Sequence, residues 1–202
     1  MKKILNKIKL TKNIKKQIEQ RLKSFEQINK KESNYWFNEL CFCLLTANSK
    51  ASTALKIEAE MGRAGFIEKS KEDVIKILKQ NGHRFYNKRT EFIILARKHI
   101  DIKNKLKNLN SIKSREFLVK NIKGLGYKEA SHFLRNVGYD DVAIIDRHIL
   151  RFLYQEKLIE KIPKTITPKF YIKCEKILSK FNIPQNELDL ILWAHMTGKV
   201  LK

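Results

Sequence analysis

The feature that most constrains the fold of this 202-residue chain is a pair of glycines, Gly124 and Gly126, between two amphipathic segments. Glycine adopts backbone angles that other residues avoid, and it lets the main chain approach a ligand closely. Apolar residues recur at helical spacing over about residues 114–122 and again over 127–137, where Gly138 ends the pattern. The spacing predicts two helices joined by a tight hairpin.

The predicted hairpin lies at the N-terminus of its second helix, which is a favourable place for an anion. Backbone N–H groups are unpaired there and the helix dipole is positive, so together they form a nest for a phosphate oxygen. Lys123 adds a positive charge beside Gly124 and Gly126. We expect these three residues to bind phosphate, although a glycine pair by itself is more often an ordinary turn.

Lys128 is the second residue of the helix that follows the hairpin, where the dipole disfavours a cation. This position, together with partial burial, would lower the pKa of the amine. At a pKa of about 10.4 only about one amine in two thousand is unprotonated at pH 7, whereas a pKa of about 7–8 makes a large fraction reactive. Lys128 is therefore a candidate nucleophile, with a solvated surface lysine as the alternative.

Asp146 follows an apolar run, residues 142–145, and precedes an amphipathic segment, so it is a candidate helix N-cap. A capping carboxylate is held rigidly at the mouth of a helix and stays ionised. Near a sugar, such a carboxylate can stabilise the positive charge that develops on the ring as a glycosidic bond breaks. Capping and catalysis are therefore compatible roles for Asp146.

In these residues the chain resembles the helix-hairpin-helix DNA glycosylase superfamily. Its members carry a leucine-glycine-valine-glycine-like hairpin, a lysine two residues after the second glycine, and an aspartate about 18 residues beyond that lysine. The matching residues are Gly124, Gly126, Lys128, Ala130, Asp146 and His148. Residues 44–49, Leu-Leu-Thr-Ala-Asn-Ser, are also similar to an early segment of endonuclease III.

The resemblance implies an all-α protein with two helical lobes and a cleft between them, into which a damaged nucleotide is flipped. We expect a helical barrel lobe over residues 33–146, with the helix-hairpin-helix at about 114–138. Residues 1–32 and 147–202 would form the second lobe. The chain has only 7 Gly and 3 Pro, which are few turn-forming residues for a sheet of many strands. Helices are expected to start near Ser33, Ser49, Ser70 and Pro184.

The resemblance also implies two activities in one enzyme, because superfamily members that only hydrolyse the base lack a lysine at the position of Lys128. The amine would attack the anomeric carbon, expel the base and form a Schiff base with the opened sugar. The strand would then break by β-elimination. Asp146 would support the developing sugar charge and help to activate the amine.

The short chain and its ending from Trp193 to Lys202 are similar to the compact 8-oxoguanine DNA glycosylase/lyase family of archaea and some bacteria. This implies that Phe85 and Trp193 stack on the flipped purine and that Lys202 helps to recognise it. Stacking reads shape and not oxidation, so discrimination needs an acceptor for the extra N–H of the oxidised ring. A terminal carboxylate or a backbone carbonyl could supply that acceptor.

Two alternatives stay open at this point. The same chemistry could act on oxidised pyrimidines, as in endonuclease III. A helix-hairpin-helix module could instead bind DNA without catalysis, in which case Lys128 and Asp146 would be coincidental.

Three more residues are candidates for DNA contacts. Asn48 aligns with the position from which endonuclease III inserts a side chain into the gap left by the flipped base, and an asparagine ending a helix is the alternative. Arg147 and His148 are predicted to hold phosphate or the helix of the active site, and purely structural roles are equally consistent with their positions.

The formal net charge of +22 indicates a polyanionic partner. We expect double-stranded DNA containing oxidised guanine to be that partner and the protein to be a monomer. The basic start, residues 1–22, has neither an 18-residue apolar run nor a cleavage-like site. No membrane association and an intracellular, cytoplasmic, nucleoid-associated location are expected.

Cysteine usage bears on cofactors. The three cysteines, Cys41, Cys43 and Cys174, form no disulfide framework. Endonuclease III and the adenine glycosylases usually carry a four-cysteine iron–sulfur cluster near the C-terminus, whereas residues 174–202 contain one cysteine. We therefore expect no iron–sulfur cluster and no metal site or other cofactor, with a monovalent cation at the hairpin as an open possibility.

Overall fold

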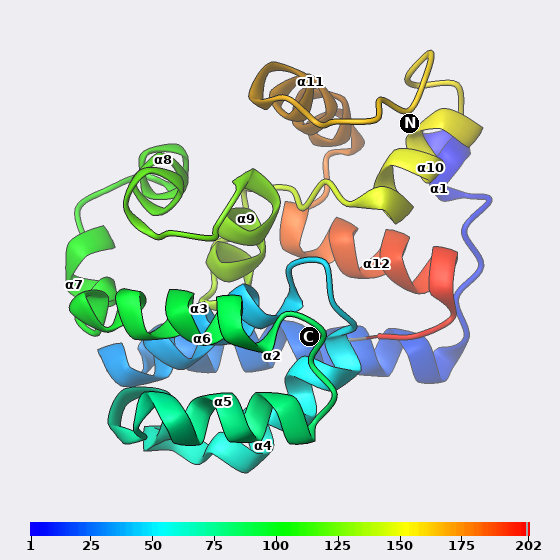
Figure 1. Cartoon of the computed structure of the whole chain (residues 1–202). Helices are drawn as coiled ribbons and strands as arrows, with labels where there is room; N and C mark the ends of the chain where they lie inside the picture. The colour runs from blue at the N-terminus through cyan, green and yellow to red at the C-terminus, as the bar shows by residue number, and fades with distance from the viewer. Residues whose placement is uncertain (201) are drawn as a thin grey trace.

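The fold is a set of packed helices in the computed structural model, which describes residues 1–200 and 202 (Figure 1). The described residues contain no β-strand, so the all-α prediction is confirmed for this part of the chain. The helices are α1 (Lys2–Leu5), α2 (Lys12–Lys30), α3 (Ser33–Thr46), α4 (Ala51–Glu68), α5 (Lys71–Gln80), α6 (Tyr86–Ala96), α7 (Ile102–Leu106), α8 (Ser111–Asn121), α9 (Tyr127–Asn136), α10 (Arg147–Gln155), α11 (Pro168–Leu178) and α12 (Gln185–Thr197). Short 3₁₀ turns follow α6 (Arg97–His99) and α11 (Ser179–Phe181).

Two hydrophobic cores divide the molecule into lobes. The larger core runs from Trp36 to Val142 and is formed around α3, which is buried on nearly every side. The second core collects apolar side chains of α10, α11 and α12, and the N-terminal residues Met1, Ile4, Leu5 and Ile8 pack on it. In Figure 1 α5–α8 lie apart from the yellow-to-red α10–α12, and α9 lies between these two groups.

Helix α2 joins the two lobes. Its Ile18 and Phe25 form a small third core with Leu190 and Ala194 of α12. At its other end, the side-chain amide of Asn29 donates a hydrogen bond to the carbonyl oxygen of Val137, at 2.7 Å. The N-terminal part of the chain therefore contacts both lobes.

The packing differs from the expected lobe division at residues 143–146. Ala143 and Ile145 are buried in the second core, although the barrel lobe was expected to extend to residue 146. Val142 is the last residue in the larger core. Because successive side chains of an extended segment point to opposite sides, residues 143–146 can line the cleft and pack into a core at the same time.

The helix-hairpin-helix is formed by α8 and α9, within three residues of the predicted bounds. Gly124 has a φ of +97°, and a Cβ atom at this position would overlap the ring of Phe92. Gly126 has a φ of −98°, is the N-cap of α9 and has no such clash. The turn therefore requires glycine at position 124 for conformational and packing reasons, and the requirement at position 126 is weaker.

The predicted helix starts are close to the observed ones. Ser70 caps α5 by accepting a hydrogen bond from the N–H of Asp73, and Pro184 is the N-cap of α12. Ser33 is the first residue of α3, whereas α4 begins two residues after Ser49. No helix among the described residues is both long enough and apolar enough to cross a membrane.

We expect Gly124→Ala to destabilise the fold by roughly 2–4 kcal/mol, because it adds a strained φ to a steric clash with Phe92. Gly126→Ala is the matched control and should cost less than about 1 kcal/mol, the usual scale of an N-cap change. Urea unfolding of both variants measures the difference. Equal losses would contradict a special requirement at position 124.

Candidate active site

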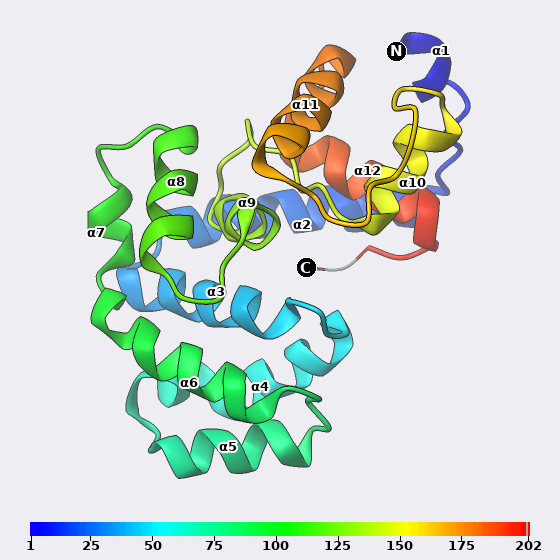
Figure 2. The same ribbon diagram turned by 45° about the horizontal axis from the view of Figure 1, so that its top comes forward.

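The residues predicted to carry the chemistry meet at a cavity of about 390 Å³ between the two lobes. Its lining includes Lys128 from α9, Asp146 from the start of α10, Trp193 from α12, and Lys202. Figure 2 shows the C-terminal end of the chain entering the space between α12 and α3. Residues far apart in sequence therefore share one site.

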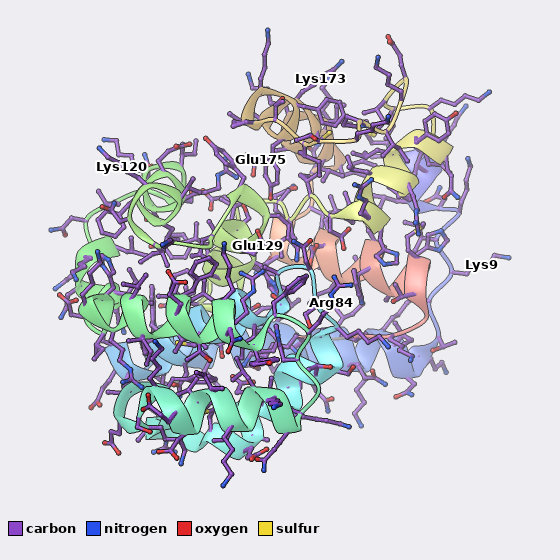
Figure 3. The ribbon with its side chains drawn as sticks, in the orientation of Figure 1. Lys9, Arg84, Lys120, Glu129, Lys173 and Glu175 are labelled. Atoms are coloured by element: carbon purple, nitrogen blue, oxygen red, sulfur yellow. The ribbon has the colours of Figure 1, made fainter. Side chains whose placement is uncertain are left out.

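A wider opening of about 1000 Å³ adjoins this cavity and shares Lys128, Asp146 and Trp193 with it. Its remaining lining comes from helices α9 and α10 and from loops, and it includes Asn48, Arg84, Glu129, Arg147, His148 and Lys164. Arg84 and Glu129, both part of this lining, are labelled in Figure 3. The smaller cavity thus opens to a surface rich in basic side chains.

Lys128 lies on the first turn of α9, directly after the hairpin, as predicted. Its side chain is 29% exposed, so the amine is reachable from the cleft. The carboxylate recorded beside it is Glu129, with 3.7 Å between Nζ and Oε1. Among the described residues no ion pair joins Lys128 to Asp146, and the two side chains face the same cavity without contact at ion-pair distance.

Asp146 caps α10, as predicted. Its Oδ1 accepts a hydrogen bond from the N–H of Ile149 at 2.8 Å, which fixes the carboxylate at the mouth of the helix. The next helix residues, Arg147 and His148, point into the wider opening. Three predicted site residues therefore meet at the start of α10.

Charged groups beneath the cavity form buried pairs. Arg135 of α9 pairs with Asp189 of α12, and both line the cavity. Burial raises the pKa of Asp189 to about 6, and the guanidinium of Arg135 opposes this shift. Arg135 also donates to Asn136, whose amide donates to the buried Glu39 at 3.0 Å.

The ammonium group of Lys202 is held by two glutamates and lies close to an aromatic ring. Nζ lies 2.8 Å from Oε1 of Glu39 and 2.5 Å from Oε1 of Glu58, and it also lies 4.5 Å from the centre of the Phe42 ring. Burial lowers the pKa of Lys202, but the two glutamates outweigh it and the net pKa is raised. The ammonium of Lys202 is therefore engaged inside the protein.

The two predicted stacking residues have different positions. Trp193 lines both cavities, and the ring of His148 lies edge-on to it with 4.7 Å between ring centres. Phe85 lines neither cavity and is 39% exposed, with the guanidinium of Arg84 4.5 Å from its ring centre. The structure brings Trp193 to the site, whereas Phe85, the N-cap of α6, is not among the residues that line either cavity.

Among the predicted DNA-contact residues, Asn48, Arg147 and His148 line the wider opening, whereas the hairpin residues do not. Asn48 has a left-handed φ of +57° just after α3, and Arg84 lies 3.4 Å from its carbonyl oxygen. Arg147 donates to the carbonyl of Lys164 at 3.2 Å. At the hairpin, Lys123 is exposed and pairs with Glu91 at 3.0 Å.

Sequence reasoning missed His132, Arg135 and Asp189 as cavity residues. His132 is one helical turn after Lys128, so its place on the same face of α9 could have been inferred. Asp189 likewise precedes Trp193 by four residues on α12. The pairing of Arg135 with Asp189 had no local signal, because it joins two helices that are distant in sequence.

His132 differs from the other buried histidines. His83 is hydrogen-bonded to the carbonyl of Leu45, at 2.9 Å, and so has a structural role. Both ring nitrogens of His132 are buried without a hydrogen-bond partner among the described residues. Burial lowers the pKa of His132 well below its usual value, and the charges of Arg135 and Lys128 add to this effect. Its imidazole is therefore neutral.

No group of three His, Cys, Asp or Glu side chains among the described residues could hold a metal ion. The three cysteines are free and buried.

Comparison with known proteins agrees with this geometry. A family model described as 8-oxoguanine DNA glycosylase matches residues 18–186. The chain belongs to this family. A relative from Methanocaldococcus jannaschii, named 8-oxoguanine DNA glycosylase/AP lyase, is 50% identical, and the match covers 98% of this chain and 99% of the relative. A relative from Aquifex aeolicus with the same name is 40% identical, with 94% of each chain covered.

Solved structures of the family have the same fold. The Methanocaldococcus jannaschii 8-oxoguanine glycosylase/lyase, in complex with a 15mer DNA containing 8-oxoguanine, matches with a TM-score of 0.92 and 48% identity, over 99% of this chain and 98% of that one. The 8-oxoguanine DNA glycosylase of Thermotoga maritima matches with a TM-score of 0.87 and 41% identity, over 94% and 93% of the two chains.

The neutral state of His132 predicts a pH dependence of stability. Below a pH of about 6.5 the unfolded chain binds a proton that folded His132 does not, so stability is lost as the pH falls. We expect His132→Phe to weaken this loss by up to about 1.4 kcal/mol per pH unit, the limit for one proton. Urea unfolding between pH 5 and 7.5 measures how the free energy of unfolding changes with pH. His195→Phe, at an exposed histidine, is the control, and parallel curves for wild type and His132→Phe would contradict the assignment.

Proposed function

We propose that this protein removes 8-oxoguanine from double-stranded DNA and then cleaves the strand at the resulting abasic site. The observation that carries the proposal is the meeting of Lys128 and Asp146, from two separate helices, in one cavity beside Trp193. A volume of about 390 Å³ lies within the usual range of small-ligand sites. The relatives named as glycosylase/lyases support the reaction class.

The proposed reaction uses Lys128 as nucleophile. The unprotonated amine attacks the anomeric carbon, the bond from that carbon to the base breaks, and the base leaves with the bonding electron pair and takes up a proton. The sugar ring then opens to a Schiff base on Lys128. Loss of a proton from the 2′ carbon expels the 3′ phosphate by β-elimination, and water releases the lysine.

Asp146 has two roles in this proposal. As an ionised carboxylate at the cavity wall it stabilises the positive charge on the sugar as the glycosidic bond breaks. It also helps to activate the amine. Because its Oδ1 is fixed by the N–H of Ile149, little reorganisation is needed during the reaction.

Base recognition is assigned to Trp193 and Lys202. The indole of Trp193 stacks on the extruded purine. The ammonium of Lys202 is held by Glu39 and Glu58, so the proposal uses a backbone oxygen of Lys202 as the acceptor for the extra N–H of the oxidised ring. A stacking role for Phe85 stays a prediction.

The proposed DNA track combines the hairpin with the rim of the wider opening. Lys123, Gly124 and Gly126 bind a backbone phosphate, Asn48 fills the gap left by the flipped base, and Arg147 and His148 hold the flanking backbone.

A monomer is sufficient, because both lobes of the cleft come from one chain. The chemistry draws on Lys128 and Asp146, so we propose no cofactor, and a monovalent cation at the hairpin and a nucleoid location stay predictions.

Borohydride trapping tests the lysine mechanism and the lesion together. We expect a covalent adduct with duplexes that carry 8-oxoguanine or an abasic site, because borohydride reduces the Schiff base. Lys128→Gln, which has no amine, should give none while still binding the duplex. An adduct with a thymine glycol duplex and none with 8-oxoguanine would move the lesion to an oxidised pyrimidine. No adduct on any duplex, with binding intact, would refute the role of Lys128.

Substitution of Asp146 can separate capping from catalysis. Asparagine also caps helices, so Asp146→Asn should change the free energy of unfolding by less than about 0.5 kcal/mol. It removes the negative charge, so the single-turnover rate of base excision should fall roughly 100-fold or more. Asp146→Ala should show the same fall in the excision rate and should also lower the free energy of unfolding by about 1 kcal/mol. An Asp146→Asn variant with the wild-type rate would exclude the proposed electrostatic role.

A further inference from the structure

The segment that delivers Asp146 to the cavity has no β-strand beside it among the residues that the structure describes. Residues 142–146 lie between α9 and α10 outside any helix, and residues 142–145 are buried. Buried backbone N–H and C=O groups need hydrogen-bond partners, because leaving them unpaired is costly. Other parts of the fold must therefore provide the partners that a strand would receive from a sheet.

Two side chains of α11 provide them. The hydroxyl of Tyr171 donates to the carbonyl of Ala143 at 2.8 Å and accepts from the N–H of Ile145 at 3.1 Å. Oε1 of Glu175 accepts from the N–H of Ala143 at 3.0 Å. Burial raises the pKa of Tyr171, so its hydroxyl stays protonated and able to donate. Three backbone groups just before Asp146 are thus paired by α11.

Glu175 is itself fixed from the helix-hairpin-helix. Arg115 of α8 makes a two-pronged ion pair with it, at 2.6 and 2.8 Å, and the Arg115 side chain is only 2% exposed. The Arg115 guanidinium lies 5.3 Å and 5.6 Å from the ring centres of Tyr127 and Tyr171. In Figure 3 Glu175 extends from α11 into the space next to α9.

We infer that Arg115, Tyr171 and Glu175 are positioning residues for the proposed reaction: they form a clasp that sets the place of Asp146 in the cavity and ties it to the hairpin. The inference rests on the proposed function for its catalytic consequence. None of the three side chains lines the cavity, so the clasp acts through the backbone of residues 143–145.

The clasp has the geometry that such a role requires. Ala143 is three residues before Asp146, so a shift of its backbone is passed along a short extended segment to the carboxylate. A misplacement of about 1 Å can cost about 100-fold in rate. The N-cap bond to Ile149 orients Asp146 relative to α10 only, whereas α9, which carries Lys128, packs on α8 and the larger core. The contact between Arg115 and Glu175 connects these two parts.

Tyr171→Phe tests the clasp by removing a single oxygen atom, that of the Tyr171 hydroxyl. Tyr127→Phe is its matched control. The two rings pack on each other with 5.5 Å between centres, but the hydroxyl of Tyr127 bonds to Glu116 at the surface. In single-turnover excision of 8-oxoguanine we expect Tyr171→Phe to lower the rate constant roughly 10- to 100-fold at an unchanged reacting fraction and DNA affinity. Tyr127→Phe should stay within about threefold of wild type.

The reacting fraction distinguishes positioning from mere stabilisation. A cluster that only stabilises the fold would reduce the fraction of active molecules and leave the rate constant of the remaining ones unchanged. That result, or a wild-type rate for Tyr171→Phe, would overturn the inference. If Tyr171→Phe does not fold, Glu175→Gln provides the same comparison, because the amide still accepts from Ala143 but loses the charge that pairs with Arg115.

A crystal structure of Tyr171→Phe gives a readout that does not depend on activity. We expect Asp146 to move relative to Lys128, and an unmoved Asp146 would overturn the inference even if excision slows. If the wild type fails to excise 8-oxoguanine, the proposed function fails. In that case the displacement of Asp146 and the rate of strand cleavage at a preformed abasic site still test whether the clasp positions Asp146.

Discussion

The geometry of the site depends on which groups form hydrogen bonds with the buried backbone of residues 142–146. This segment carries Asp146 from one lobe to the other, and no strand lies beside it in the part of the chain that the structure describes, so it has no sheet partner there. Its polar groups are paired instead by side chains of α11, and the N-cap of α10 fixes its end. The distance from Asp146 to Lys128 across the cleft is thus a property of the packing of several helices.

Charge is distributed unevenly between the surface and the cavity. The net charge of +22 makes the outside attractive to a polyanion. Beneath the cavity, however, positive groups are matched to carboxylates, as in Arg135 with Asp189 and Lys202 with Glu39. The Nζ of Lys128 lies farther from its carboxylate neighbour, 3.7 Å from Oε1 of Glu129, and Lys50 and Lys199 also line the cavity. The basic surface is thus distinct from the cavity, where buried carboxylates pair with several of the positive side chains.

Local signals in the sequence predicted local structure well. Gly124 and Gly126 predicted the hairpin, and the apolar run before Asp146 predicted its place as a helix cap, because turns and caps depend on a few neighbouring residues. Phe85 and His132 show the limit of such reasoning. Phe85 was expected to stack on the flipped purine and lines neither cavity, while His132 was not among the predicted site residues and lines the smaller cavity. Which way a side chain faces depends on how its helix packs.

The sequence by itself predicted the helical class, the hairpin, and Lys128 and Asp146 as the proposed nucleophile and carboxylate, since these follow from periodicity, short motifs and the resemblance that those motifs carry. Only the tertiary structure decided that the two groups share a cavity, that the Lys202 ammonium is held by Glu39 and Glu58, and that α8 is tied to Asp146 through Arg115 and α11. The physical reason is that these are contacts between residues distant in sequence. Their partners are chosen by burial and hydrogen-bond satisfaction in the assembled fold, and no local pattern encodes them.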